Sequence, residues 1–355
     1  MSKFLSKKLA ALEPYVPGEQ PKDRSYIKLN TNESPYPPSD GVLRAVASEA
    51  GSLMLYSDPE ARELSSEFEK LFGFGADSVI FTNGSDEALD FAFYAFSDKD
   101  SPIAFPDLTY GFYSVFAELY GIPYTEIPLR SDFSVNTEDY IGIDKNIVIA
   151  NPNAPTGLFL PLSDIERIVA SNPERVVIID EAYVDFGGES AMALTRKYKN
   201  LVVTGTFSKS RSLAGARLGF AVADPELIAD MNRVKFSRNP YNVNRMTAAA
   251  GAAALRDNGY YMENCERIIA SREYARKELL KLGFTVTDSR TNFLFCASPD
   301  IDGETLYTEL RARGILVRHF GKERIKNFNR ITIGTEEQTK ALIAAIEDIL
   351  KGVKR

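Results

Sequence analysis

The sequence predicts an α/β fold, in which a mostly parallel sheet of the seven-stranded type carries helices on both faces, together with a smaller α+β domain. Between residues 79 and 223, short apolar runs alternate with longer segments of helical periodicity. These runs are almost continuously apolar, which is typical of strands buried on both faces of a sheet. After residue 284 the runs alternate apolar and polar residues, which indicates an antiparallel sheet with one wet face. With 355 residues, the chain is too long for one ordinary core.

The N-terminal part should be extended, because residues 14–40 are rich in Pro, Asn, Ser and Gly. Helical periodicity begins near residue 41 and returns at 59–72, a segment that starts with Pro59 and stops before Gly73. Six strands are then predicted for the large domain, at 79–82, 102–105, 146–150, 176–180, 201–204 and 218–223.

A long helical tract follows over roughly 224–282, and a C-terminal helix covers 341–350. Between them lie the four predicted strands of the smaller domain, at 284–288, 292–296, 315–318 and 330–333. We expect three parts: an arm over 1–40, a large domain over 41–245, and a small domain over 246–355 that includes a connecting long helix.

Composition excludes several classes of protein. The net charge of −7 disfavours a nucleic-acid binder, which usually needs a basic face. One histidine and two cysteines without a CxxC pair argue against a metal site and against Ser-His-Asp catalysis. No apolar stretch is long enough to span a bilayer. We therefore expect a cytoplasmic enzyme that binds neither metal, membrane nor nucleic acid.

Polar residues follow the predicted strands, where an α/β sheet binds its ligands. After 79–82, Gly84 would let a ligand approach the backbone, and Ser85 and Asp86 would open a helix whose N-terminus favours phosphate. Taken alone, this pattern favours a plain helix cap, with Ser85 or Asp86 as the N-cap. Tyr110, which follows 102–105, could cover a flat ligand or pack in the core.

Two later strands end in charged residues. Asp180 is costly at the end of a buried strand unless a cation, such as a pyridinium nitrogen, or a structural ion pair compensates it. Lys209 is a candidate for a Schiff base, with Ser208 and Arg217 beside it to hold a phosphate. A phosphate cap, an aromatic ring, an acid and an amine at four strand ends together indicate one site.

With these residues in place, the chain resembles the histidinol-phosphate aminotransferase group of the fold-type I, aspartate aminotransferase-like pyridoxal-phosphate enzymes. The resemblance runs over nearly the whole length. Its motifs are Y-V-P-G (15–18), L-N-T-N-E-S-P (29–35), Y-S-D-P (56–59), N-G-S-D-E (83–87), T-Y (109–110), N-P-N-A-P-T-G (151–157), D-E-A-Y (180–183), S-K (208–209), G-A-R-L-G-F (215–220) and R-I-T-I-G-T (330–335).

The resemblance implies pyridoxal 5'-phosphate as cofactor. Lys209 would form the Schiff base and move the proton at the substrate Cα, while Asp180 would keep the pyridine nitrogen protonated. Tyr110 would stack on the ring, and Tyr183 would bind its phenolic oxygen. The cofactor phosphate would be held by Gly84, Ser85, Asp86, Thr206, Ser208, Arg217 and, from the neighbouring subunit of a homodimer, Tyr56.

The same resemblance implies small-molecule substrates, with Arg318 and Arg330 gripping an anionic group and with Tyr15 and Asn32 of the arm assisting. The implied reaction exchanges an amino group between histidinol phosphate and 2-oxoglutarate or glutamate, in histidine biosynthesis. Two alternatives share the cofactor: a threonine-phosphate decarboxylase of the same lineage, and an aromatic or broad-specificity aminotransferase. A regulatory protein built on this domain would need a DNA-binding segment, which we do not find.

One position departs from the family pattern. Many members carry asparagine directly before P-T-G, where its amide holds the phenolic oxygen, but this chain has Ala154. Asn153, Asn151 or a water would take over that role, or Tyr183 would act alone. His319 is as consistent with the surface as with the substrate pocket, and Cys296 is expected in the core.

Overall fold

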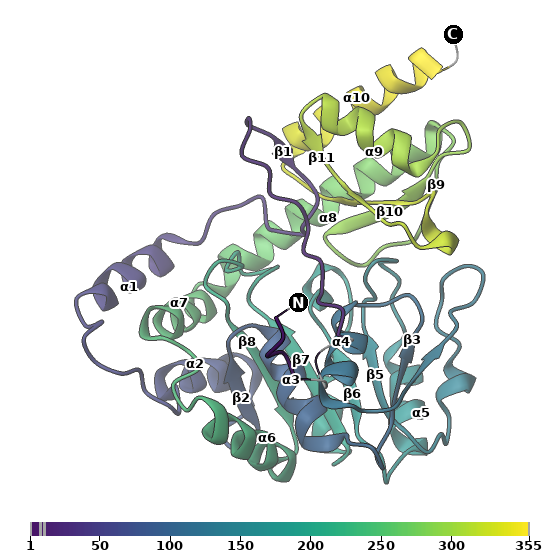
Figure 1. The fold of residues 1–355 in the computed structure, drawn as a ribbon. Helices are drawn as coiled ribbons and strands as arrows, with labels where there is room; N and C mark the ends of the chain where they lie inside the picture. The colour runs from purple at the N-terminus through teal and green to yellow at the C-terminus, as the bar shows by residue number, and fades with distance from the viewer. Residues whose placement is uncertain (1, 7–8, 10–11, 354–355) are drawn as a thin grey trace.

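A seven-stranded sheet forms the centre of the molecule in this computed structural model, which describes residues 2–6, 9 and 12–353. Its strand order is β2-β8-β7-β6-β5-β3-β4 (Figure 1). All neighbouring pairs are parallel except those made by β8. The strands are β2 (Val79–Thr82), β3 (Ile103–Pro106), β4 (Tyr124–Ile127), β5 (Asn146–Ala150), β6 (Val177–Asp180), β7 (Leu201–Thr206) and β8 (Gly219–Ala223).

Six of these strands coincide with the predicted ones within two residues, which confirms the α/β class. The seventh, β4, was missed. Its Y-T-E-I sequence lies at the edge of the sheet and is exposed or half-exposed. An edge strand of this kind carries no continuous apolar run, and so the pattern that marked the central strands is absent from it.

Helices cover both faces of the sheet. Val148 and Ile178 face α3 (Ser85–Phe96), α4 (Phe112–Tyr120) and α6 (Pro225–Arg238), whereas the alternate residues Ile147 and Val177 face α5 (Leu162–Ser171). Burial of both sets explains why the strands are apolar at nearly every position. Near the β2 edge, α1 (Asp40–Ala50), α2 (Arg62–Phe72) and α7 (Arg245–Arg256) share a third core. Short 3₁₀ turns lie at η2 (Thr137–Tyr140), η3 (Val184–Phe186), η4 (Ala191–Arg196) and η5 (Glu323–Ile325).

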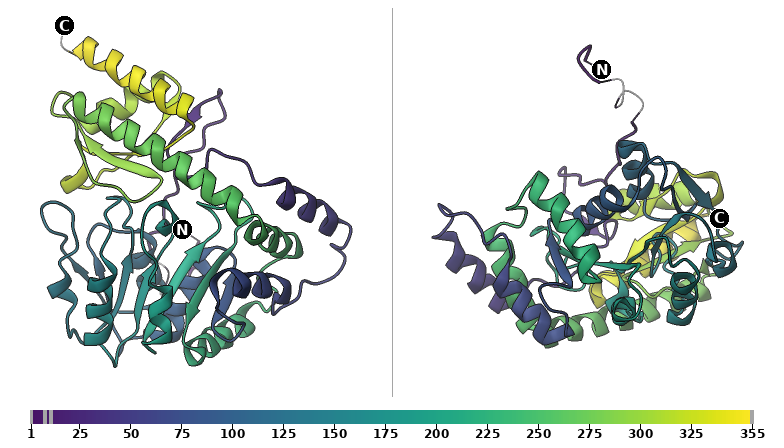
Figure 2. Two further views of the ribbon diagram at one scale, coloured as in Figure 1. Left: turned by 180° about the vertical axis from the view of Figure 1, so that it is seen from behind. Right: turned by 90° about the horizontal axis from the view of Figure 1, so that it is seen from below.

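Two predicted helical segments have different bounds. The helix expected from Pro59 begins three residues later, at Arg62, and ends as predicted before Gly73, whose φ is 74°. The tract expected over 224–282 is three helices, because a loop containing Pro240 separates α6 from α7 and Asp257 separates α7 from α8 (Asn258–Lys281). Figures 1 and 2 show α8 crossing from the large sheet to the small one.

The smaller sheet is antiparallel, with the order β12-β13-β10-β9, and packs against α8, α9 (Gly303–Ala312) and α10 (Glu336–Val353). Its strands are β9 (Thr285–Val286), β10 (Phe293–Ala297), β12 (Arg318–His319) and β13 (Asn329–Thr332). The strand predicted at 315–318 is divided: its first half is β11 (Ile315–Leu316), which pairs in parallel with β1 (Ile27–Lys28) of the arm.

The arm is therefore not the unpacked segment that its composition predicts. Leu29, Asn30 and Asn32 are each 1% exposed, and the Leu29 carbonyl accepts a hydrogen bond from the backbone N–H of Thr332 in β13. The predicted arm and small domain also include residues 1, 7–8, 10–11 and 354–355, which lie outside the described residues.

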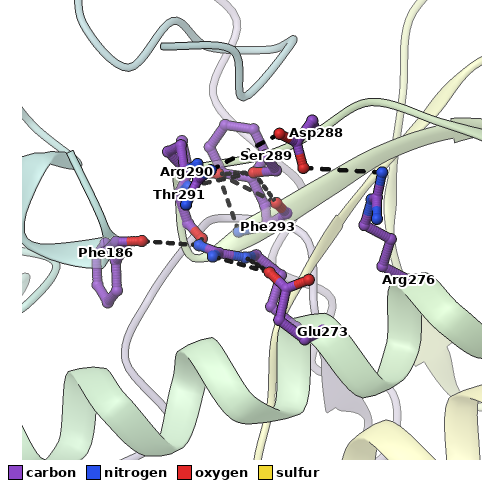
Figure 3. A network of polar contacts seen from close by, with 9 residues as sticks. Phe186, Glu273, Arg276, Asp288, Ser289, Arg290, Thr291 and Phe293 are labelled. Atoms are coloured by element: carbon purple, nitrogen blue, oxygen red, sulfur yellow. Dashed lines mark hydrogen bonds and ion pairs between the residues drawn. The ribbon is translucent and has the colours of Figure 1, made fainter.

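A buried arginine joins the two sheets. Arg272 of α8 donates from Nη1 to the carbonyls of Phe186, in the turn after β6, and of Thr291, in the loop before β10, both at 2.8 Å. Figure 3 shows Phe186 on one side of this network, with Thr291 and Phe293 on the other. Among the described residues, no helix has the length and apolarity needed to cross a bilayer.

Candidate active site

A cavity of about 310 Å³ lies where the large sheet, the small sheet and the arm meet. It opens at the carboxyl ends of the parallel strands, as expected for an α/β sheet. Most predicted site residues line it, although they come from widely separated parts of the chain. These are Tyr15, Asn32, Ser85, Asp86, Tyr110, Asp180, Tyr183, Thr206, Ser208, Lys209, Arg217, Arg318 and Arg330.

One end of the cavity, where α3 begins, suits a phosphate group. Gly84 has a φ of 83° and precedes α3, whose first N–H groups, those of Ser85 and Asp86, have no partner within the helix. A Cβ on Gly84 would overlap the Arg217 guanidinium. That guanidinium donates to the Asp86 carboxylate at 2.8 Å and to the Ser208 hydroxyl at 3.4 Å. Helix N–H groups beside an arginine form a site for an anion.

Thr206 and Tyr110 complete this end of the cavity. The Thr206 hydroxyl donates to the Ser208 hydroxyl at 3.0 Å and accepts the backbone N–H of Ser208 at 3.1 Å. The Tyr110 hydroxyl donates to Asp86 Oδ1 at 2.7 Å, and burial raises its pKa well above the ordinary value. Both residues are therefore fixed in place around the anion site.

Asp180 lies at the end of β6 with its carboxylate buried. Burial raises its pKa to about 6, although Tyr113 donates to it at 2.8 Å and Thr204 at 3.2 Å. A carboxylate held by neutral donors in a buried position would gain from a cationic partner. Sequence reasoning missed Tyr113 and Thr204. The parallel register could have suggested Thr204, which is the β7 partner of Asp180.

Lys209 projects into the cavity from the turn after β7. Its Nζ donates to the Thr31 carbonyl of the arm at 3.3 Å. Burial, followed by the positive charge of Arg330, lowers the pKa of this amine to about 8. A larger fraction of the side chain is therefore neutral at physiological pH than for an ordinary lysine, and the neutral amine is the nucleophilic form.

The opposite wall carries two arginines. Arg318 and Arg330 are directly opposed on β12 and β13. Arg330 donates to the Asn30 carbonyl at 3.2 Å, but its buried Nε has no partner among the described residues. Like charges at opposed positions destabilise a sheet, so an anion bound between them would relieve the cost. Tyr15 lines the same wall and stacks on Phe112 at 4.4 Å.

Three predicted or open positions lie elsewhere. Tyr56 is 79% exposed, stacks on Tyr241, and does not line the cavity of its own chain. His319 lines an adjoining cavity and approaches the Lys326 carbonyl at 2.7 Å. Cys296 is fully buried in the core of the small domain, as predicted.

Ala154 lines the cavity, but neither neighbouring asparagine turns towards it. The Asn153 amide donates to the Leu108 carbonyl and the Thr156 hydroxyl. The Asn151 side chain is paired with the backbone of Leu160. Of the four alternatives for the missing amide, these contacts therefore favour Tyr183 or a water over the two asparagines.

Comparison with known proteins agrees with this geometry. The family model described as aminotransferase class I and II matches residues 24–346. The chain belongs to this family. It is 47% identical to the histidinol-phosphate aminotransferase of Brachyspira hyodysenteriae, over 99% of this chain and all of that one. It is 49% identical to the enzyme of the same name from Aromatoleum aromaticum, again over 99% and 100%.

Solved structures share the fold. A histidinol-phosphate aminotransferase from Sinorhizobium meliloti, in complex with pyridoxal-5'-phosphate, superposes with a TM-score of 0.90 at 22% identity, covering 99% of both chains. A Thermus thermophilus aspartate aminotransferase mutant superposes with a TM-score of 0.82 at 18% identity, covering 97% and 99%. The fold is therefore that of the fold-type I enzymes.

The chain is thus an aminotransferase whose cofactor is pyridoxal phosphate. The cavity fits this group on three independent points. The turn at Gly84 and Arg217 suits a phosphate, the buried Asp180 carboxylate suits a pyridinium nitrogen, and the Lys209 amine lines the same cavity.

Proposed function

We propose that this aminotransferase exchanges an amino group between histidinol phosphate and 2-oxoglutarate or glutamate, as a step of histidine biosynthesis. Relatives of that name, nearly half identical over the full length, support the assignment. The observation that carries it is the opposed pair Arg318 and Arg330 on the wall across from the cofactor site.

The paired arginines account for the choice of substrates. The amino donor and acceptor must use one cavity in turn, and each carries an anionic group. A guanidinium presents several fixed N–H donors that match either a phosphate or a carboxylate. Arg330 keeps a free Nε for this purpose, while Arg318 is steadied by the carbonyls of Val16 and Pro17 in the arm.

Bound pyridoxal phosphate supplies an electron sink for the pair of electrons left at the substrate Cα. The residues of the chain would hold the cofactor, orient it and move the proton. Lys209 Nζ would hold the cofactor covalently and then carry the Cα proton. Asp180 would keep a proton on the pyridine nitrogen, and Tyr110 would cover the ring. The arm, which lines the cavity with Tyr15 and Thr31, would exclude water from these transfers.

We further propose a cytoplasmic homodimer in which Tyr56 enters the cavity of the neighbouring subunit. Tyr56 belongs to an exposed apolar segment with Leu53, Met54 and Leu55. Such a segment is typical of a subunit interface. The division into an arm over 1–40, a large domain over 41–245 and a small domain over 246–355 remains part of the same proposal.

The first test is an absorption spectrum of the purified holoenzyme before and after adding histidinol phosphate, with no keto acid present. Conversion of the lysine-bound aldehyde form of the cofactor into its amine form would support the proposal. If that form persists, and carbon dioxide is released from threonine phosphate instead, the enzyme is the decarboxylase. Equal conversion by aromatic amino acids without phosphate would indicate a broad-specificity aminotransferase.

A further inference from the structure

Asn32 forms part of the wall of the cavity, yet its side chain is engaged by protein groups. It is 1% exposed and has a φ of 56°, in the left-handed region. Its Nδ2 lies 2.9 Å from the Tyr183 hydroxyl, and its Oδ1 lies 2.9 Å from the Thr332 hydroxyl. The amide thus bridges a residue beside the cofactor site and a residue of the small sheet.

The Asn32 amide is oriented with its oxygen towards Thr332. The Thr332 hydroxyl oxygen accepts the backbone N–H of Asn32 at 3.0 Å, and the hydroxyl donates its hydrogen to Asn32 Oδ1. In this orientation the amide nitrogen donates to the Tyr183 oxygen.

This order determines where the Tyr183 proton can point. Because the hydroxyl oxygen already accepts from Asn32, its own hydrogen is directed to another acceptor. Tyr183 lines the cavity, where the phenolic oxygen of the cofactor is the acceptor that the family pattern predicts. At the same place Ala154 offers no side-chain donor, and Asn151 and Asn153 are engaged elsewhere.

We propose that Asn32 and Thr332 are positioning residues, which keep the Tyr183 hydroxyl donating to the phenolic oxygen of the cofactor. In a chain with alanine at 154, this relay compensates for the missing amide. It also links the cofactor to the arm, which carries Asn32, and to β13, which carries Thr332. The inference rests on the cofactor and not on histidinol phosphate as the substrate.

Asn32→Asp is the sharpest test, because aspartate tolerates a positive φ and has nearly the same shape. A carboxylate only accepts hydrogen bonds, so the Tyr183 proton would turn towards residue 32 and away from the cofactor. The readout is the pH titration of the absorbance of the bound cofactor, without substrate. Loss of one hydrogen bond to the charged phenolic oxygen should raise the pKa of this transition by about one unit.

The new charge of the variant also raises that pKa, and Tyr183→Phe separates the two effects. In the Tyr183→Phe background the charge acts alone, so Asn32→Asp should then produce a clearly smaller shift than in the wild type. Thr332→Val is the neutral second variant. Without the Thr332 hydroxyl, the Asn32 amide can rotate so that its oxygen faces Tyr183. We expect a smaller increase in the pKa of the cofactor's absorbance transition than in Asn32→Asp.

Three outcomes would overturn the proposal. The first is that the pKa of the cofactor's absorbance transition is unchanged in both Asn32→Asp and Thr332→Val. The second is that the pKa shift of Asn32→Asp is fully additive with that of Tyr183→Phe. The third is that the variants lower only the thermal stability. A raised KM for the phosphate-bearing amine, with an unchanged transition, would instead indicate that Asn32 contacts the substrate. Because the titration contains no substrate, its result is independent of the proposed reaction.

Discussion

The amine of Lys209 is surrounded by charges of both signs. Burial opposes its protonation most strongly, Arg330 and Arg217 oppose it further, and Glu33 and Asp86 favour it. The resulting pKa of about 8 means that the neutral, nucleophilic amine becomes the major form just above physiological pH. Arg330, which we propose binds the anionic group of a substrate, thus also lowers the pKa of the lysine amine.

A pH dependence of cofactor capture follows. In the cofactor-free protein, the rate at which added pyridoxal phosphate bonds to Lys209 should rise with pH and level off above about 8, as the amine loses its proton. Arg330→Gln removes the strongest opposing charge and should move the midpoint to higher pH. Stopped-flow absorbance measures the rate, and Arg318→Gln is the matched control, with a smaller shift expected. A midpoint near 10.5, the ordinary value for lysine, would contradict the assigned environment.

The sequence predicted the residues at the strand ends better than it predicted their partners. Asp180 ends one buried strand and Lys209 follows the next, and so their meeting at one edge was foreseeable. Arg217 precedes β8, and the antiparallel pairing of β8 with β7 brings it to the same edge. Tyr113 was not, because a tyrosine inside an apolar helix gives no sign that its hydroxyl reaches Asp180 from 67 positions away. The bridge made by Asn32 was equally hidden, since it depends on how the arm lies against β13.

At the scale of elements, the β2–α3 turn is fixed by two glycines. The backbone of Gly84 adopts a left-handed φ beneath Arg217, and a Cβ on Gly219 of β8 would overlap the backbone at Gly84 and Ser85. The start of α3 is thereby brought close to the first residue of β8, two residues after Arg217. The motif N-G-S-D-E indicated a helix N-terminus, but not this close approach.

Gly84→Ala should therefore lower the affinity for the cofactor more than it lowers the stability of the fold. The added methyl group displaces the Arg217 guanidinium, and cofactor affinity should fall by about tenfold or more, as for one lost charge-assisted hydrogen bond. Gly121→Ala is the matched control. Its φ is also positive, at 69°, but its Cβ would meet nothing within 4 Å. Gly121→Ala should lose about 1 kcal/mol of stability through its left-handed backbone. Gly84→Ala should lose more, because its φ of 83° and ψ of 163° lie in a region that is essentially restricted to glycine. Equal cofactor affinity in the two, measured by fluorescence titration, would contradict the crowding argument.

Arg272 offers a test of how α8 holds the sheets together. Its side chain is 2% exposed, and Arg272→Met leaves the carbonyls of Phe186 and Thr291 without their donor. We expect a loss of about 3 kcal/mol in the free energy of unfolding, measured by urea denaturation. Arg276→Met, one turn along α8, removes only a loose pair with Asp288 at 3.7 Å and should cost less than about 1 kcal/mol. Similar losses in both variants would show that the bridge adds nothing.

The limits of sequence reading at this scale have physical causes. The central strands were recognised because burial on two faces demands apolar residues throughout. The edge strand β4 was not recognised because its residues are exposed or half-exposed and need not be apolar. The arm looked unpacked because its Pro and Asn residues are typical of loops, yet β1 gains its hydrogen bonds from β11, almost 290 positions later. Local composition carries no information about a partner so distant in the chain.

The whole molecule is expected to work as a pair of subunits. Tyr56 stacks on Tyr241 at the surface, away from the cavity of its own chain. If it completes the cavity of the neighbour, each active site needs Lys209 from one subunit and Tyr56 from the other. An inactive subunit of either type could then still contribute to an active site.

Hybrid dimers test this directly. Lys209→Ala and Tyr56→Ala proteins should each be nearly inactive, but a mixture unfolded and refolded together should regain about a quarter of the wild-type activity, because half of the dimers are hybrids with one intact site. Each variant refolded alone is the control. The double variant Lys209→Ala/Tyr56→Ala mixed with wild type distinguishes the geometry further, since its hybrids hold two damaged sites. No recovery in the first mixture, with dimers present by sedimentation, would place Tyr56 outside the neighbouring site.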